Sequence, residues 1–202
     1  MSEGPVTRVE AGSASASENR RALLRGGGLL IGVAATLVPS LATARARHKG
    51  AGAAAGDVSI LQGALALEHE GIAAYRLAGG SGLLKPETLK VALLFKGHHE
   101  QHRDALAALV TRAGSKPVEP RSDAEYAKDL DLASLKSEGD VVALATKLEL
   151  GATNAYAGQV AALQDHNLTH LFTQLSTDEA VHWTTLNNAA GTPIPAKAFL
   201  FG

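Results

Sequence analysis

The sequence predicts an all-α fold, a bundle of four helices in which two antiparallel pairs are joined by one long crossover. Alanine is abundant and aromatic side chains make up only 4% of the 202 residues, which suits close-packed helices better than a β-sandwich. Four long segments place apolar residues at helical spacing. Of the three connections between them, only the middle one, residues 115–139, is long. These lengths favour two antiparallel pairs with a crossover between helices 2 and 3.

The first pair of helices is delimited by residues that begin and end helices. The first helix is expected over about 58–78, with Asp57 as its N-cap and Gly79 directly after it. The second helix is expected over about 86–113 and ends before Gly114. It begins with a proline, the residue that the first helical position tolerates best.

The second pair follows the polar crossover and repeats the first pair. One or two short helical turns are expected between residues 123 and 136. The third helix is expected over about 140–164, and the fourth over about 168–190 after a tight turn. A shift of 80 or 81 positions superposes the two pairs, most clearly for Glu68 on Glu149, Tyr75 on Tyr156 and His102 on His182. A duplicated helix pair fits both shifts.

The first 46 residues differ in character from the rest of the chain. Arg20 and Arg21 stand in the motif Asn-Arg-Arg-x-Leu-Leu-Arg, followed by a weakly apolar run over 26–44. This run is about long enough to span a membrane, but its glycines and Pro39 make it a poor anchor. The segment resembles a twin-arginine export signal, and we favour a cleaved signal peptide over 1–46.

Small residues mark the end of this signal. Cleavage is expected after Ala44 or Ala46, each of which closes a small-x-small pattern. A flexible segment over 47–56 would then precede a single domain over 57–202. We therefore expect a periplasmic or otherwise exported protein, which meets the membrane only transiently during export.

Composition and charge exclude several classes of protein. The net charge is −1 and no basic block interrupts the body of the chain, so nucleic acid is not expected as a partner. The chain has no cysteine, which excludes a disulfide framework and a rubredoxin-like electron centre. Metal ions are the expected partners, and the helix faces could also support a homo-oligomer.

Polar residues recur near the middle of all four apolar helix faces. Histidines and glutamates three positions apart share one face of a helix, as in Glu179-Ala180-Val181-His182. Burying the carboxylates without a cation would cost much free energy. The pattern therefore predicts metal binding by Glu68, His99, His102, Glu149, Glu179 and His182.

This set resembles that of the carboxylate-bridged dimetal proteins of the ferritin-like superfamily. Those proteins use one glutamate on helices 1 and 3 and Glu-x-x-His on helices 2 and 4. The resemblance implies iron as a di-iron pair, or zinc or manganese, and oxidation of Fe(II) or reduction of a peroxide. The second helix departs from the pattern, because His99 stands where a glutamate is expected. This exchange would weaken one metal position, or favour a single metal or a zinc-like site.

Two other functions stay open at this point. The first is a non-catalytic envelope protein whose degenerate metal site serves only as a polar core, in stress protection or as an interaction module. The second is a protein that binds or stores metal without turnover. The tyrosines at 75 and 156 also have two interpretations: each is a hydrogen-bond donor to a ligand carboxylate, or a core residue that contacts a neighbouring helix. His98 lies off the apolar face and is expected to face solvent.

Overall fold

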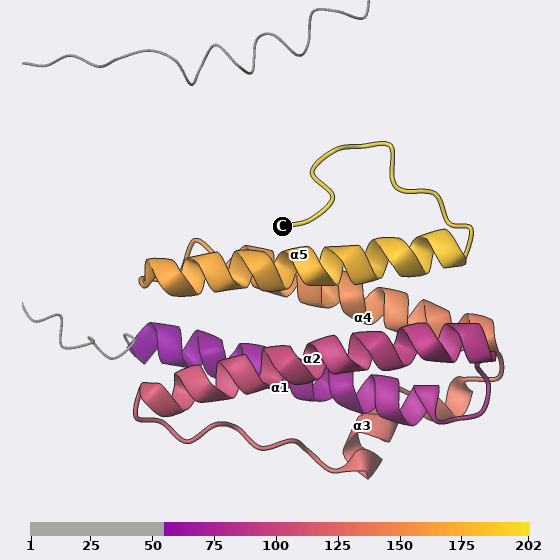
Figure 1. Cartoon of the computed structure of the whole chain (residues 1–202), viewed down its shortest axis with the longest axis horizontal. Helices are drawn as coiled ribbons and strands as arrows, with labels where there is room; N and C mark the ends of the chain where they lie inside the picture. Colours follow the sequence, from indigo (N-terminus) through magenta and orange to yellow (C-terminus); the bar gives the residue numbers. More distant parts are fainter. Residues whose placement is uncertain (1–54) are drawn as a thin grey trace, which may run out of the picture. The chain divides into compact units, whose positions relative to one another are not determined.

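The computed structural model describes residues 55–202, and in this range the chain forms helices and no strands (Figure 1). The expected signal peptide and most of the expected flexible segment lie outside the described residues. None of the described helices is long and apolar enough to cross a membrane. The helices are α1 (Ala55–Gly79), α2 (Pro86–Arg112), α3 (Asp123–Asp129), the 3-10 helix η2 (Leu132–Ser134), α4 (Glu138–Gln159) and α5 (His166–Ala189).

The four long helices form the expected antiparallel pairs, α1 with α2 and α4 with α5 (Figure 1). The crossover carries α3 and η2 and runs along α1. Gln62 of α1 holds it by donating to the carbonyl of Lys116 at 2.7 Å and accepting from the amide of Val118 at 2.8 Å. Further along, Arg76 forms an ion pair with Asp123 at the start of α3. The predicted all-α bundle with one long crossover is thus confirmed.

The turn between α4 and α5 corrects two details of the sequence analysis. Asp57 does not cap α1: it lies within the first turn, and its buried carboxylate accepts from the amides of Gln164 and Asp165 at 3.0 and 3.1 Å. The loop that these bonds fix begins earlier than expected, because α4 ends at Gln159. An acidic residue at the start of a helix can therefore accept hydrogen bonds from a loop that is distant in sequence.

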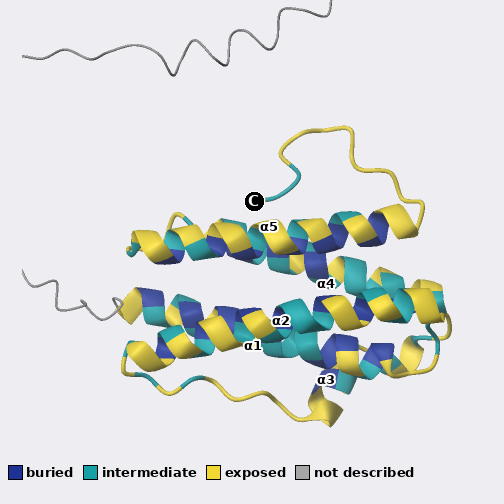
Figure 2. Ribbon diagram, viewed as in Figure 1, coloured by how far each residue is buried: buried dark blue, intermediate teal, exposed yellow. Residues whose placement is uncertain are grey.

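Two apolar clusters fill the bundle on either side of its midpoint (Figure 2). The first draws on the start of α1, the ends of α2 and α4 and the start of α5, and contains Leu61, Ala64, Leu65, Leu106, Val110, Tyr156, Leu168, Phe172 and Leu175. The second draws on the opposite ends of these helices and contains Tyr75, Ala92, Phe95 and Leu186. Buried polar side chains occupy the section between the clusters.

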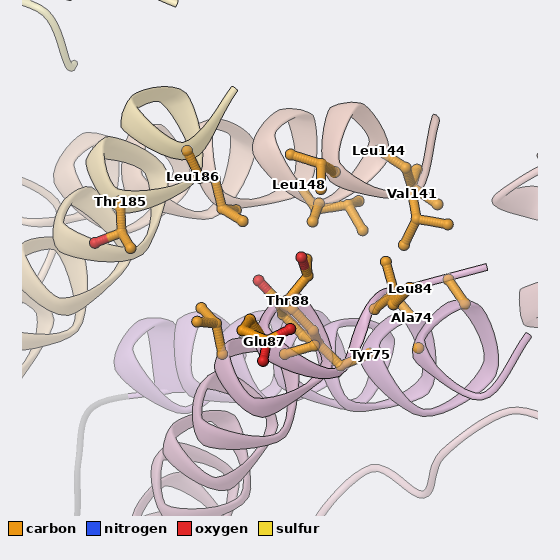
Figure 3. A pocket seen from close by; sticks show the side chains of 17 residues that line it. Ala74, Tyr75, Leu84, Glu87, Thr88, Val141, Leu144, Leu148, Thr185 and Leu186 are labelled. Carbon is orange, nitrogen blue, oxygen red and sulfur yellow. The ribbon is translucent and has the colours of Figure 1, made fainter. Parts of the chain in front are cut away.

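An apolar cavity of about 230 Å³ lies beside the second cluster, between the two helix pairs. Figure 3 shows Val141, Leu144 and Leu148 of α4 facing Ala74 and Tyr75 of α1 across it. Alanines line much of the remaining wall. The wall is mostly apolar, although Glu87, Thr88 and Thr185 also line it, and the empty space removes packing contacts from the residues around it.

Filling this cavity is expected to stabilise the protein. Ala145→Leu places a larger side chain in it and should raise the free energy of unfolding by about 0.5–2 kcal/mol. Urea unfolding followed by circular dichroism measures the change. Ala143→Leu on the exposed face of α4 is the control, because it adds the same atoms without burying them. An Ala145→Leu variant no more stable than this control would contradict a fillable cavity.

A carboxylate joins the beginnings of α2 and α4. Glu138 accepts from the Thr88 hydroxyl at 2.5 Å and from the Lys85 amide at 3.2 Å, and its other oxygen lies 2.7 Å from the Lys85 ammonium. The Lys85 side chain, followed by Thr88 and the Lys85 amide, lowers the pKa of Glu138 from 4.5 to about 2. This tether therefore acts in the ionised form.

Glu138→Gln is expected to lower the unfolding midpoint at pH 7 by a small amount. The folded pKa is depressed, so the contribution is fully present above pH 4.5 and is lost as the pH falls toward about 2. The difference between Glu138→Gln and the parent should therefore shrink across this interval. Thermal unfolding at several pH values measures it, with Glu87→Gln in the exposed first turn of α2 as control. A pH-independent difference would show that the carboxylate charge is not involved.

Candidate metal centre

The six residues predicted as metal ligands meet at the midpoint of the bundle. Each lies on the inward face of its helix, and none is more than 9% exposed. They form two overlapping groups in which the potential ligand atoms all lie within 4.8 Å of one another. One group contains Glu68, His99, His102 and Glu179, and the other contains His99, Glu149, Glu179 and His182. We name these groups the first and the second half-site.

Two residues belong to both half-sites, and each presents one atom to either side. His99 places Nδ1 2.7 Å from Glu68 and Nε2 3.3 Å from Glu149. Glu179 places Oε1 3.3 Å from Nδ1 of His102, and Oε2 3.0 Å from Nδ1 of His182. The geometry is therefore that of two adjacent ligand sets that share His99 and Glu179.

Nδ1 of His102 and Oε1 of Glu179 are buried and lie 3.3 Å apart, but neither atom forms a hydrogen bond of acceptable geometry with the other or with any other group. Nε2 of His102 lies 3.2 Å from the carboxylate of Asp178. When Nε2–H donates to this carboxylate, the lone pair of Nδ1 is free and directed into the first half-site. An imidazole held by an outer carboxylate is the usual arrangement of a metal-ligating histidine.

The equivalent histidine of the second half-site is held from outside by another histidine. Nε2 of His182 lies 2.9 Å from Nδ1 of His98, and the ring stacks on Phe95 with 4.0 Å between the ring centroids. Nδ1 of His182 then points toward Glu149 and Glu179, at 3.4 and 3.0 Å. His102 and His182, which each belong to only one half-site, are called the terminal histidines. Both therefore direct Nδ1 inward.

Two tyrosines connect the helix pairs through the same carboxylates. The Tyr75 hydroxyl of α1 donates to Glu149 of α4, and the Tyr156 hydroxyl of α4 donates to Glu68 of α1. Burial, followed by the nearby carboxylates, raises the pKa of each tyrosine well above its usual value, so both remain donors. Both interpretations of the tyrosines hold, because each donates to a candidate ligand and also lies in an apolar cluster and contacts a neighbouring helix.

The charges of the six residues depend on one another. Burial opposes ionisation of Glu68, but the nearby imidazoles of His102 and His99 outweigh it and lower the pKa of that carboxyl. The pKa of Glu149 is also lowered by His182 and His99 against burial, whereas burial raises the pKa of Glu179.

The pKa values of the three histidines of the centre are raised. Burial disfavours their charged form, but the neighbouring carboxylates outweigh it and raise the pKa of His102 to about 10. The same balance, with Glu149 as a main partner, raises the pKa of His99 and of His182. Without a metal, protons on these rings offset the carboxylates, and a metal ion must displace them to bind.

The sequence analysis did not identify two residues that contact the centre, His98 and Asp178. His98 was expected to face solvent, which is wrong, because it is partly buried against His182. Asp178 was not singled out, although it lies next to Glu179. A search for outer partners of the two terminal histidines could have found both. Glu100, the carboxylate nearest in sequence to His99, pairs with Lys96 at 2.6 Å and does not enter the centre.

The centre is reached through a second cavity, of about 290 Å³, between α1 and α4. It extends from the exposed residues Lys147 and Gly151 to the buried residues Glu68, His99 and Glu149. Gly71 lies in its wall, and a Cβ atom there would lie only 3.2 Å from Nδ1 of His99. A small residue at 71 therefore makes room for the imidazole ring.

Comparison with known proteins agrees with this architecture. The family model described as ferritin-like domain matches residues 56–192. No curated protein matches the sequence. A solved structure, that of the conserved hypothetical protein rv2844 from Mycobacterium tuberculosis, superposes with a TM-score of 0.60 at 22% sequence identity, covering 71% of this chain and 96% of that chain. At this identity the likeness concerns the fold, and it is the family match over most of the chain that makes this protein a member of the ferritin-like domain family.

Proposed function

We propose that this protein is an exported metalloprotein that binds two divalent transition-metal ions, one in each half-site. The observation that carries the proposal is the pair of unpartnered atoms, Nδ1 of His102 and Oε1 of Glu179. A buried polar atom without a partner costs about 1–3 kcal/mol. A cation in the first half-site would satisfy both atoms at once.

The chemistry of the donors supports transition metals. Glu68 and His102 would hold the first ion, Glu149 and His182 would hold the second, and His99 and Glu179 are common to both. Each half-site therefore offers imidazole nitrogen and carboxylate oxygen, a mixture that suits zinc, copper, nickel or iron.

The residues around these ligands would fix and shield them. Asp178 and His98 hold the outer nitrogens of the terminal histidines, and Tyr75 and Tyr156 orient the terminal carboxylates. The two apolar clusters exclude water from both ends of the bundle. When bound, the metals would supply Lewis-acid chemistry or, for iron, oxidation of Fe(II) or reduction of a peroxide.

Export is part of the proposal on the strength of the twin-arginine motif at Arg20-Arg21. The twin-arginine route carries folded proteins, which would allow a metal to be inserted before export.

A second candidate function is a metal-free envelope protein, and a specific observation favours it. The centre contains equal numbers of glutamates and histidines, and their mutual contacts raise the pKa of every one of the three imidazoles. Three protonated rings would neutralise three carboxylates without any metal. In that case the centre would serve only as the polar core of an interaction or stress-protection protein.

Metal content separates the two candidates. The full chain is exported from cells supplied with zinc and iron, and the metal in the purified protein is measured by elemental mass spectrometry. We expect up to two metal ions per chain in the parent and a loss of most of this metal in the Glu149→Ala, Glu179→Ala variant. The matched control, Glu87→Ala, Glu100→Ala, removes two carboxylates outside the centre and should retain the metal.

A parent protein without metal, correctly folded by circular dichroism, would reject the dimetal proposal and favour the metal-free core. Bound metal without turnover of Fe(II) or peroxide would identify a binding or storage protein. Failure to recover the protein outside the cytoplasm would reject export alone.

The cavity between α1 and α4 predicts how metal enters. Gly151→Trp should block its mouth and slow zinc uptake by the metal-free protein at least tenfold, while the final stoichiometry stays unchanged. Stopped-flow competition with a zinc-sensitive dye measures the rate. Gly158→Trp, two turns along the exposed face of the same helix, is the control. Equal rates in the two variants would place the entry route elsewhere.

A further inference from the structure

We infer that His99 bridges the two metal ions through both of its ring nitrogens, and that the pair is therefore of the zinc or copper type. This inference rests on the proposed metal binding and goes beyond it by assigning the bridge. It concerns the one position at which the chain departs from the four-carboxylate pattern.

The first argument is the position of the ring. His99 is 4% exposed and its two nitrogens face different half-sites, Nδ1 toward Glu68 and Nε2 toward Glu149. An imidazole that served one metal alone would direct its other nitrogen to an outer partner, as His102 does with Asp178. His99 has candidate metal ligands at both nitrogens.

The second argument is the equivalence of His99 and Glu179. The 80-residue repeat places them at the same position of their helix pairs, and each presents one atom to either half-site. Glu179 does so with two carboxylate oxygens, directed toward His102 and toward His182. His99 does so with two ring nitrogens, and it therefore occupies the bridging position of the duplicated pair.

The third argument is space and orientation. The bare backbone of Gly71 allows the ring to fit, since a Cβ atom there would press on Nδ1 of His99 at 3.2 Å and on the adjacent ring carbons. One turn further along α1, the Tyr75 ring lies 5.5 Å from the imidazole, centroid to centroid, with a tilt of 31°. The ring is thus confined with its nitrogens facing the two half-sites.

The fourth argument is charge. Two divalent ions carry four positive charges, and the centre holds only three carboxylates. An imidazole bound to metal at both nitrogens loses its N–H proton to solvent and becomes an imidazolate with one negative charge. The bridge then supplies the missing charge, which Glu100 does not, because it pairs with Lys96. No oxidation or reduction accompanies this step.

The metal preference follows from the donor set. With an imidazolate bridge, each ion has two nitrogen and two carboxylate ligands, a combination that zinc and copper accept readily. An imidazole ring also holds two ions farther apart than the roughly 3.5–4 Å of carboxylate-bridged two-metal sites.

The test uses the full chain loaded with Cu²⁺ alone or Zn²⁺ alone. Two Cu²⁺ ions joined by an imidazolate couple magnetically, so we expect the electron paramagnetic resonance intensity to fall to less than half that of two isolated Cu²⁺ ions. X-ray absorption of the zinc form should show equal numbers of nitrogen and oxygen ligands and no metal neighbour at about 3.5–4 Å.

Variants at the bridge assign the effect to His99. His99→Gln should lower the stoichiometry to one ion or fewer and abolish the coupling. His99→Glu should add a second carboxylate bridge to that of Glu179, retain two ions, shorten the metal–metal distance and bind Fe²⁺ at least tenfold more tightly than the parent. His170→Gln, at an exposed position of α5, is the matched control and should change none of these values.

Three outcomes would overturn the inference. One is a parent that binds two metals with a metal–metal distance of about 3.5–4 Å. Another is coupling that persists in a folded His99→Gln variant. The third is a parent that binds a single ion whose affinity is indifferent to His99→Gln. In the first two cases binding of two metal ions would stand, and in the third only binding of one ion would stand. A parent that binds no metal would overturn both proposals together.

Discussion

Three carboxylates are buried at the midpoint of an apolar bundle, and their negative charge is the constraint on which the surrounding structure depends. Ionised carboxylates cannot remain in such an environment without compensation. Imidazoles face Glu68, Glu149 and Glu179 from the neighbouring helices, and tyrosine hydroxyls complete the shells of the first two. Apolar clusters on both sides keep water from weakening these contacts.

The same residues allow two ways of neutralising that charge. Protons on the histidines can balance the carboxylates, as the raised pKa values of His99, His102 and His182 indicate. Metal ions can replace these protons, because each terminal histidine directs a nitrogen inward. Under the proposed function, metal uptake is then an exchange of cations, in which metal ions displace the protons of the histidines.

The sequence was sufficient for the architecture and for the principal residues of the centre. Loop lengths and apolar periodicity predicted the paired helices, and the repeat, at a shift of 81 for the glutamates and 80 for the histidines, brought Glu149 and His182 into register with Glu68 and His102. These signals work because an inward helix face recurs with fixed geometry. The outer partners were not found for the same reason: Asp178 is one position away from such a face.

The sequence did not predict the long-range hydrogen bonds either. The position of Asp57 at a helix start suggested a local cap, but its carboxylate binds amides more than 100 residues away. Periodicity assigned His98 to solvent, because it does not show that the neighbouring helix also covers the edge of α2.

The internal repeat has a consequence for how such a centre could arise. Each helix pair alone carries three of the six central residues, and two copies of the α4–α5 type would together carry four glutamates and two histidines. A symmetric dimer of short helix pairs would thus already hold a complete carboxylate-bridged centre. Joining two copies in one chain removes the requirement that both be identical. In a symmetric dimer, any substitution would occur in both copies at once. A single chain that contains both helix pairs can instead carry a histidine in one pair and a glutamate in the other, as it does with His99 and Glu179.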